Sequence, residues 1–144
     1  MTQSIRARYE AAHDEGRPLI GGHRGNPAQH SENTLRSFRS AIAAGCDLIE
    51  CDVHLSSDSR LIVIHDHTLD RTTNGKGLVR DHSPAELRRH EAGQGAPPPL
   101  LPAVTALSLG TVGPVTELIE RPRQRPGPQG TPPGALPPHR PAPA

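Results

Sequence analysis

The sequence predicts an α/β fold whose strands are of the parallel type. Short apolar runs indicate strands at 18–22, 46–55 and 61–64, and apolar residues at helical spacing indicate a helix between the first two. A near-continuous run of branched apolar residues is typical of a parallel strand that is covered on both faces. Strands that alternate with helices in this way are the pattern of α/β architectures.

The first predicted strand, 18–22, ends in two glycines. Glycine permits positive φ or a close approach of the backbone to a ligand. His23 and Arg24 follow directly, so they lie at the end of this strand. Residues 1–17 are mixed and weakly helical, and they are not assigned to an element.

A helix is predicted over 34–44, with Asn33 as its N-cap. Leu35, Phe38 and Ile42 recur at helical spacing and form one apolar stripe. The glycine that follows is a typical stop signal. The stripe predicts that Phe38 packs in the core rather than binding a ligand.

The second predicted strand, 46–55, carries two carboxylates. The two-residue period of a strand places Glu50 and Asp52 on one face and the apolar residues beside them on the other. Two carboxylates about 7 Å apart along a strand repel each other, so they need a cation or a shared proton. The apolar flanks indicate a buried strand rather than a solvated acidic surface.

A turn at 56–60 leads into the third predicted strand, 61–64, which we expect to be parallel to the others. It ends in His65 and Asp66, so a third apolar run again delivers polar side chains at its end. The repetition of this pattern is the main indication of an enzyme site.

The composition of the chain changes near residue 95. A polar loop over 68–81 and a helix over 83–90, which begins with Ser, Pro and Glu at capping positions, complete the first unit, 1–96. Fourteen of the 17 prolines lie after residue 96. We expect a further helix or strand within 97–120 and a disordered tail rich in Pro, Gly and Arg over 121–144.

Composition and charge argue against several classes of protein. The formal net charge is +1, and the first half has no block of like charges, which argues against nucleic-acid or membrane-surface binding. No apolar run approaches the roughly 18 residues of a transmembrane segment, and no secretory signal is visible, so a cytoplasmic location is expected. Cys46 and Cys51 bracket a strand too extended for a disulfide, which predicts free thiols.

Taken together, the polar clusters resemble the N-terminal signature of the glycerophosphodiester phosphodiesterase family. Their order and the gaps between them also fit, and the match covers about residues 19–93. The matching residues are Gly22–Gly25, Glu32–Thr34, Glu50–Val53, Ile64–Asp66 and Thr68–Gly75.

The resemblance implies a TIM-type (β/α) barrel and hydrolysis of a glycerophosphodiester to glycerol 3-phosphate and an alcohol, assisted by a divalent metal, Mg²⁺ or Ca²⁺. It implies that His23 and His65 are the general acid and base, that Arg24 contacts the phosphate, and that Glu50 and Asp52 ligate the metal. Histidine titrates near neutrality and can play either role, so which one is the acid stays open. Carboxylate oxygens suit a hard cation.

The match is shorter than the fold that it implies. A complete barrel needs roughly 200–250 residues, so we expect a partial barrel, with the N-terminal strands and helices only and with edge strands left unpaired. The family places a third metal-ligating glutamate on the next strand. The nearest match is Glu120, in a degraded context at the end of a possible strand over 114–120, and it is not assigned as a ligand.

Other interpretations remain open. A related phospholipase D-like or sphingomyelinase D-like enzyme shares the histidines and carboxylates. Product analysis separates the two interpretations, because such a lyase forms a cyclic phosphate and a hydrolase forms a monoester. A non-catalytic remnant or adaptor would use the Pro-rich tail instead. A zinc site is disfavoured, because the nine histidines match no compact ligand spacing.

Overall fold

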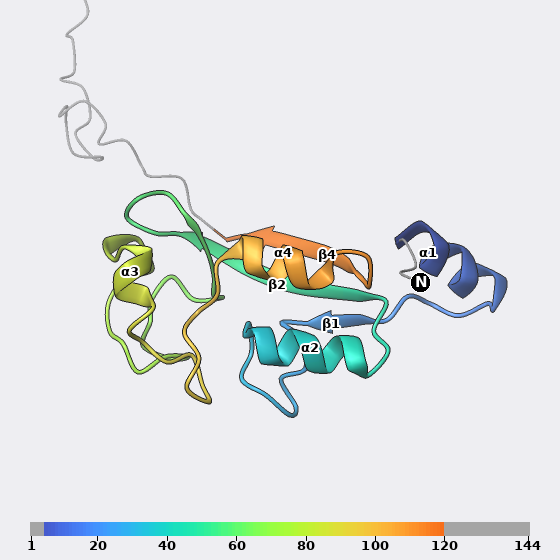
Figure 1. Cartoon of the computed structure of the whole chain (residues 1–144), viewed down its shortest axis with the longest axis horizontal. Helices are drawn as coiled ribbons and strands as arrows, with labels where there is room; N and C mark the ends of the chain where they lie inside the picture. Colours follow the sequence, from blue (N-terminus) through green and yellow to red (C-terminus); the bar gives the residue numbers. More distant parts are fainter. Residues whose placement is uncertain (1–4, 120–144) are drawn as a thin grey trace, which may run out of the picture.

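The computed structural model describes residues 5–119, and residues 1–4 and 120–144, including the predicted tail 121–144, lie outside the described part. A mixed sheet with helices on one face confirms the predicted α/β class (Figure 1). In chain order the elements are α1 (Ile5–Asp14), β1 (Gly21–His23), α2 (Leu35–Ala43), β2 (Leu48–Leu55), β3 (Leu61–Val63), the 3₁₀ turn η1 (Val79–Asp81), α3 (Pro84–Leu87), α4 (Leu101–Ser108) and β4 (Gly113–Leu118).

Strand β2 is the centre of the sheet and pairs along both of its edges. β4 lies parallel to residues 48–53 of β2. β1 pairs parallel with residues 48–50, and β3 pairs antiparallel with residues 53–55. Because a strand has only two edges and β4 takes one of them, β1 and β3 must share the other, one after the other.

The prediction that 61–64 is a parallel strand is wrong. β3 returns antiparallel to β2, because the connection 56–60 is far too short for a parallel crossover, which needs about a dozen residues. Ser59 supports the tight hairpin by adopting a φ of 63°. The branched apolar composition reflects burial, since Ile62 and Val63 are each 1% exposed, and burial does not determine strand direction.

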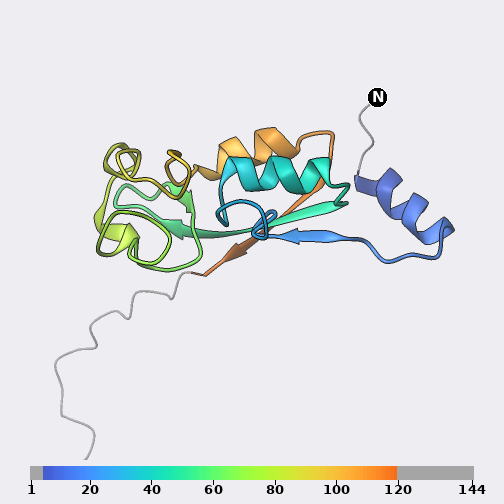
Figure 2. The same cartoon turned by 90° about the horizontal axis from the view of Figure 1, so that it is seen from below.

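Both crossover helices lie on the same face of the sheet (Figure 2). α2 connects β1 to β2, α4 precedes β4, and the two helices contact each other. A doubly wound sheet would place helices on both faces, whereas successive turns on one face are the winding of a (β/α) barrel. The structure is therefore a part of such a barrel, as expected.

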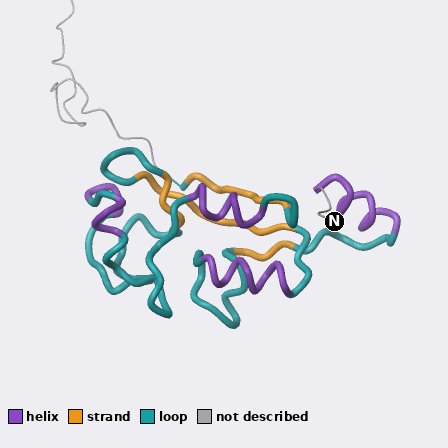
Figure 3. The backbone as a smooth tube through the Cα atoms, in the orientation of Figure 1, coloured by secondary structure: helices purple, strands orange, loops and turns teal. Residues whose placement is uncertain are grey.

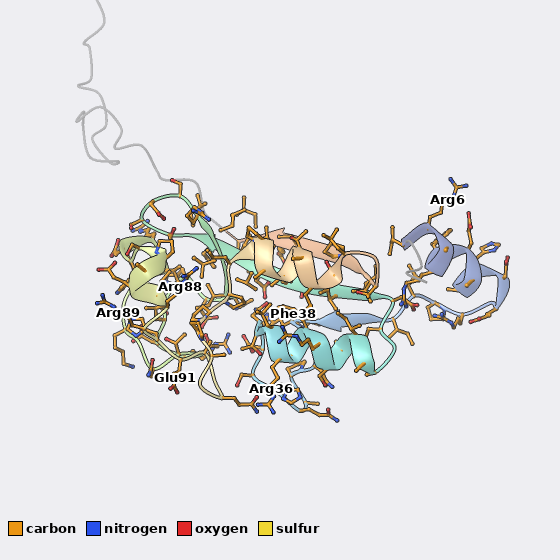
Figure 4. All side chains as sticks on the ribbon, viewed as in Figure 1. Arg6, Arg36, Phe38, Arg88, Arg89 and Glu91 are labelled. Atoms are coloured by element: carbon orange, nitrogen blue, oxygen red, sulfur yellow. The ribbon has the colours of Figure 1, made fainter. Side chains whose placement is uncertain are left out.

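The helices cover the face of β2 that carries Ile49, Cys51 and Val53, as the two-residue period predicts. Phe38 on α2 is fully buried against this face and lies at the centre of the core (Figure 4). Cys46 and Cys51 are free thiols, and burial raises the pKa of Cys51. The opposite face of β2 is left for Glu50, Asp52 and His54.

The sequence predicted Asn33 as the N-cap of α2, and this is wrong: the N-cap is Thr34. The Thr34 hydroxyl accepts a hydrogen bond from the Ser37 N–H, the role of an N-cap side chain. Asn33 instead takes a φ of 56°, a region that asparagine tolerates better than most residues, and its side chain turns toward β2. Adjacent Asn and Thr are both good caps, so propensity alone does not distinguish them.

Residues 66–99 form a loop-rich unit beyond one end of the sheet (Figure 3). The predicted helix start is confirmed, because Ser83 and Glu86 form a reciprocal capping box, although α3 ends at Leu87. A second small core holds this unit together: Ile62, Ile64, Leu69, Val79 and Leu87. None of the helices within residues 5–119 has the length and apolar character needed to cross a membrane.

Helix α1, in a segment that the sequence analysis left unassigned, lies at the opposite end of the sheet and is held there through Asp47. This carboxylate is 2% exposed, lies 2.8 Å from Arg17 Nη1 and 3.7 Å from Arg8 Nη1, and accepts a hydrogen bond from the Ile20 N–H. The hydrogen bonds from Arg17 and Ile20 lower the pKa of Asp47.

Replacing Asp47 by Asn should lower the free energy of unfolding by about 1 kcal/mol at neutral pH, because a buried charge-assisted contact is lost. A lowered pKa stabilises the fold above about pH 4 and ceases to do so as the pH falls through that lowered value. The difference between the two proteins should therefore shrink in acid, as measured by urea unfolding between pH 7 and pH 3. Asp14→Asn, at a side chain that is 83% exposed, is the control. A difference that is independent of pH would contradict this account.

Candidate functional site

The candidate site lies where the parallel strands β1, β2 and β4 end. The register places His23 of β1 opposite Glu50 of β2, and Asp52 of β2 opposite Glu117 of β4. These side chains share the face of the sheet that the helices leave uncovered. Function at the C-terminal ends of parallel strands is the rule in (β/α) barrels.

Three carboxylates from two neighbouring strands form the centre of the site. One oxygen from each of Glu50, Asp52 and Glu117 lies within 4.8 Å of the others. Asp52 is buried, Glu50 half-buried and Glu117 exposed. Like charges this close repel unless a cation lies among them, and three carboxylates are a donor set that suits Mg²⁺ or Ca²⁺. These residues therefore fit a divalent metal.

Glu117 was not identified from the sequence. The sequence offered Glu120 as the nearest match for a third acidic ligand, but Glu120 lies outside the described residues. A strand was expected over 114–120, and β4 runs over Gly113–Leu118. Only its register against β2 shows that Glu117 comes beside Asp52. Register depends on long-range pairing, which a single sequence does not reveal.

Gly22 at the end of β1 and Gly25 in the turn after it both lie close to α2. Gly25 has a φ of 91°, and a Cβ there would overlap with the side chain and backbone of Ser37 on α2. A Cβ on Gly22 would come within 2.8 Å of the Ala41 Cβ. The turn therefore lies directly against α2, and this close packing determines where His23 and Arg24 leave the strand.

Arg24 lies between the acidic cluster and a second carboxylate. Its backbone N–H donates to Glu50 Oε2 at 3.0 Å, and its Nη1 donates to Glu32 Oε1 at 3.2 Å. Its Nε is 3.2 Å from Asp52 Oδ2 but is not aligned to donate a hydrogen bond there. The Arg24 guanidinium therefore partly offsets the negative charge of the cluster. Its buried Nε–H has no hydrogen-bond acceptor among residues 5–119.

Asn33 holds Asp52 in place from the other side. Its Nδ2 donates to Asp52 Oδ2 at 2.9 Å, and the Asp52 N–H donates to Asn33 Oδ1 at 3.4 Å. Both residues are at most 3% exposed, so these bonds are shielded from water. The left-handed backbone at Asn33 is what directs the amide toward β2 rather than toward α2.

The two histidines reach the site from the shared edge of β2. β1 ends opposite Glu50, and β3 runs back until the Ile64 N–H donates to the Asp52 carbonyl. β1 and β3 therefore run toward each other along this edge of β2, and His23 and His65 come from the ends that face each other. His23 is 69% exposed, with Nε2 3.9 Å from Glu50 Oε2. The ring of His54 on β2 donates from Nε2 to the His65 carbonyl at 2.8 Å and fixes the backbone there.

His65 is oriented by an ion-pair network that the sequence did not reveal. Its Nδ1 lies 2.7 Å from Asp66 Oδ1. Arg71 donates from Nε to Asp66 Oδ2 and from Nη2 to Glu32 Oε1, each at 2.7 Å. Hydrogen bonds from Arg71 hold the pKa of Asp66 well below its ordinary range and also lower the pKa of Glu32.

The ionised state of Asp66 determines the tautomer of His65. A carboxylate can only accept hydrogen bonds, so His65 Nδ1 must carry the proton in this contact. Nε2 is then the nitrogen that is free for acid–base chemistry. Through Arg71, Glu32 and Arg24 the same network continues to Asp52, so the histidine and the acidic cluster are parts of one connected arrangement.

Comparison with known proteins gives one consistent result. Residues 23–122 match the model of the glycerophosphoryl diester phosphodiesterase family. A glycerophosphodiester phosphodiesterase from Caldanaerobacter subterraneus subsp. tengcongensis is 47% identical over 75 residues, which are 52% of this chain and 31% of that protein. One from Bacillus altitudinis is 51% identical over 73 residues, which are 51% of this chain and 30% of that protein.

Solved structures agree with the sequence comparison. The crystal structure of a glycerophosphodiester phosphodiesterase from Agrobacterium tumefaciens matches with a TM-score of 0.67 and 40% identity over 69% of this chain and 46% of that one. An Oleispira antarctica phosphodiesterase in complex with the product sn-glycerol-3-phosphate matches with a TM-score of 0.66 and 37% identity over 70% of this chain and 44% of that one. The chain thus spans less than half the length of these relatives.

Replacing Arg71 by Met should weaken the preference of His65 for the Nδ1–H tautomer, because Asp66 loses the cation that orients its carboxylate. Long-range ¹H–¹⁵N correlation spectra of the neutral imidazole report which nitrogen is protonated. We expect Nδ1–H in the wild type and in Arg71→Lys, and a mixture of tautomers in Arg71→Met. Arg88→Met, at an exposed arginine beside α3, is the matched control (Figure 4). An unchanged tautomer in Arg71→Met would show that the network does not orient the histidine.

Proposed function

The chain belongs to the glycerophosphoryl diester phosphodiesterase family, and we propose that its site hydrolyses glycerophosphodiesters to glycerol 3-phosphate and an alcohol. One observation carries this proposal. Three carboxylates on neighbouring strands lie at the same end of the sheet as two histidines and an arginine. Phosphodiester hydrolysis needs charge neutralisation on the phosphoryl oxygens and an acid–base pair, and this set of residues can supply both.

Glu50, Asp52 and Glu117 are the residues that would hold a divalent metal. A bound Mg²⁺ or Ca²⁺ would neutralise charge on the phosphoryl oxygens, which is the chemistry that such an ion supplies. Asn33 keeps the buried carboxylate of Asp52 in one orientation by its hydrogen bond. The protein thereby presents a fixed ligand rather than one that must be ordered on binding.

His23 and His65 act as the acid–base pair. One imidazole takes the proton from the attacking water or hydroxyl as its oxygen forms the new bond to phosphorus. The other, as imidazolium, gives a proton to the alcohol oxygen as the bond from that oxygen to phosphorus breaks. His65 Nε2 is available for either role because Asp66 engages Nδ1.

Arg24 is the substrate-binding residue in this proposal. Its guanidinium is held by Glu32 beside the acidic cluster, so it is oriented before any substrate arrives. Its Nε is buried and donates no hydrogen bond within residues 5–119, and a phosphoryl oxygen is an acceptor that would satisfy it. A pre-oriented arginine costs less conformational entropy on binding than a free one.

The bound product of the Oleispira antarctica relative supports a phosphomonoester product. A phospholipase D-like or sphingomyelinase D-like lyase would instead release a cyclic phosphate, so product analysis by ³¹P NMR separates the two reactions. With the full chain and glycerophosphoglycerol, we expect glycerol 3-phosphate to appear with Mg²⁺ or Ca²⁺ and not with EDTA. Release that is unaffected by EDTA, or no release with either ion, would refute the proposal.

Exchanging either His23 or His65 for Ala should lower the rate of glycerol 3-phosphate release by at least about 100-fold, the usual contribution of a general acid or base. His13→Ala on α1, where the ring is 75% exposed, is the matched control and should leave the rate unchanged. Both active-site variants should keep the circular dichroism spectrum of the wild type. Wild-type rates in both would exclude the pair from catalysis.

Replacing Glu117 by Gln should weaken binding of Mg²⁺ or Ca²⁺ by at least about tenfold, because one of three carboxylate ligands loses its charge. Glu120→Gln is the matched comparison, since the sequence alone offered that position. Isothermal titration calorimetry measures both without reference to turnover. If Glu120→Gln weakened metal binding and Glu117→Gln did not, Glu117 would not be the third ligand that the register of β4 provides.

A further inference from the structure

A cavity of about 820 Å³ adjoins the site on the side of His65. It lies between the end of β2, the residues after β3 and the 3₁₀ turn η1, and Leu55 and Ile119 contribute apolar parts of its wall. Its volume falls within the roughly 300–1,000 Å³ of small-molecule sites. A diester whose phosphate lies at the acidic cluster has two ends, and this cavity is large enough for the alcohol end.

The charges on the cavity wall do not suit a cation. Asp66 is its one carboxylate within the described residues, and both of its oxygens accept hydrogen bonds from Arg71. The remaining ionisable groups that line it are basic. Arg80 is exposed and forms no ion pair within residues 5–119, and His67 is also exposed. Among residues 5–119, a positively charged alcohol in this cavity would therefore meet an arginine and no available anion.

The chain also lacks the alternative means of holding a quaternary ammonium group. Such groups bind over the faces of Trp, Tyr or Phe. The sequence has no Trp, one Tyr and one Phe. Tyr9 lies on α1 and Phe38 is fully buried in the core, so neither lines the cavity. Arg80, the rings of His65 and His67 and the Thr68 hydroxyl are instead donors for the oxygens of a hydroxyl-rich molecule. The third histidine of the wall, His54, already donates from Nε2 to the His65 carbonyl.

We propose that this cavity receives the alcohol end of the diester and selects a polyol, such as glycerol or inositol, over a cationic amino alcohol such as choline. The inference rests on the proposed function and adds the class of alcohol to it. Because His65 lines the cavity, it is the histidine beside the departing oxygen. Its imidazolium gives up a proton to that oxygen as the bond to phosphorus breaks, while His23 on the Glu50 side takes the proton of the attacking group.

Binding of intact diesters to the full chain in EDTA tests this inference without turnover. ¹H–¹³C spectra of histidine-labelled protein should show glycerophosphoinositol and glycerophosphoglycerol shifting the ring signals of His65 and His67. We expect both to bind about three- to tenfold more tightly than glycerophosphocholine, the range expected for a hydrogen bond to a partly exposed group. Arg80→Ala should reduce this preference, and Arg80→Glu should reverse it.

Arg89→Glu, which makes the same charge change beside α3 and away from the cavity, is the matched control and should leave the preference unchanged (Figure 4). Glycerophosphocholine binding as tightly as the polyol esters would overturn the inference and leave the proposed function intact. A preference for the polyol diesters that is unchanged in Arg80→Glu would likewise overturn the inference and leave the proposed function intact. A third outcome is that no diester binds in EDTA, while metal-supported release of glycerol 3-phosphate proceeds at the same rate from all three diesters. In that case the inference about the alcohol fails and the proposed function stands. If neither binding nor release occurs, both fail.

Discussion

Pairing of β2 along both edges is the constraint on which the rest of the structure depends. A strand with a neighbour on each side cannot rotate about its axis, so its alternate side chains have fixed destinations. Ile49, Cys51 and Val53 are committed to the core beneath the helices, and this commits Glu50 and Asp52 to the opposite face. The favourable free energy of burying these apolar side chains thus holds the two carboxylates close together on the other face, despite their repulsion.

The crowded carboxylates are tolerated because cations are interleaved with them. Arg24 lies between Asp52 and Glu32, and Arg71 lies between Glu32 and Asp66. This alternation of charge runs from β2 to the segment after β3 and joins residues that are distant in the sequence. It accounts for the low pKa of Glu32 and of Asp66, and it holds an arginine and a histidine in place before a ligand arrives.

Sequence reasoning recovered what depends on local periodicity and missed what depends on long-range pairing. The faces of β2, the core position of Phe38 and the start of α3 follow from residue spacing and capping preferences. The direction of β3, the cap at Thr34 and the ligand candidate Glu117 do not follow from spacing. Asn33 bonds Asp52 rather than capping α2, and Glu117 comes beside Asp52 through the pairing of β4 with β2, so both depend on a partner distant in the sequence. For β3, the shortness of the turn 56–60 was the signal that could have corrected the prediction. Arg71 lay within the family-like segment but gave no sign of its partners.

The most direct test of the central claim is paramagnetic broadening by Mn²⁺, which accepts carboxylate-rich sites that suit Mg²⁺. The claim is that a cation held by Glu50, Asp52 and Glu117 would lie close to both His23 and His65. One equivalent of Mn²⁺ should broaden the ring signals of His23 and His65 together and leave those of His13 on α1 sharp. Broadening of only one of the two, or of His13 instead, would show that the strand ends do not form a single metal-centred site.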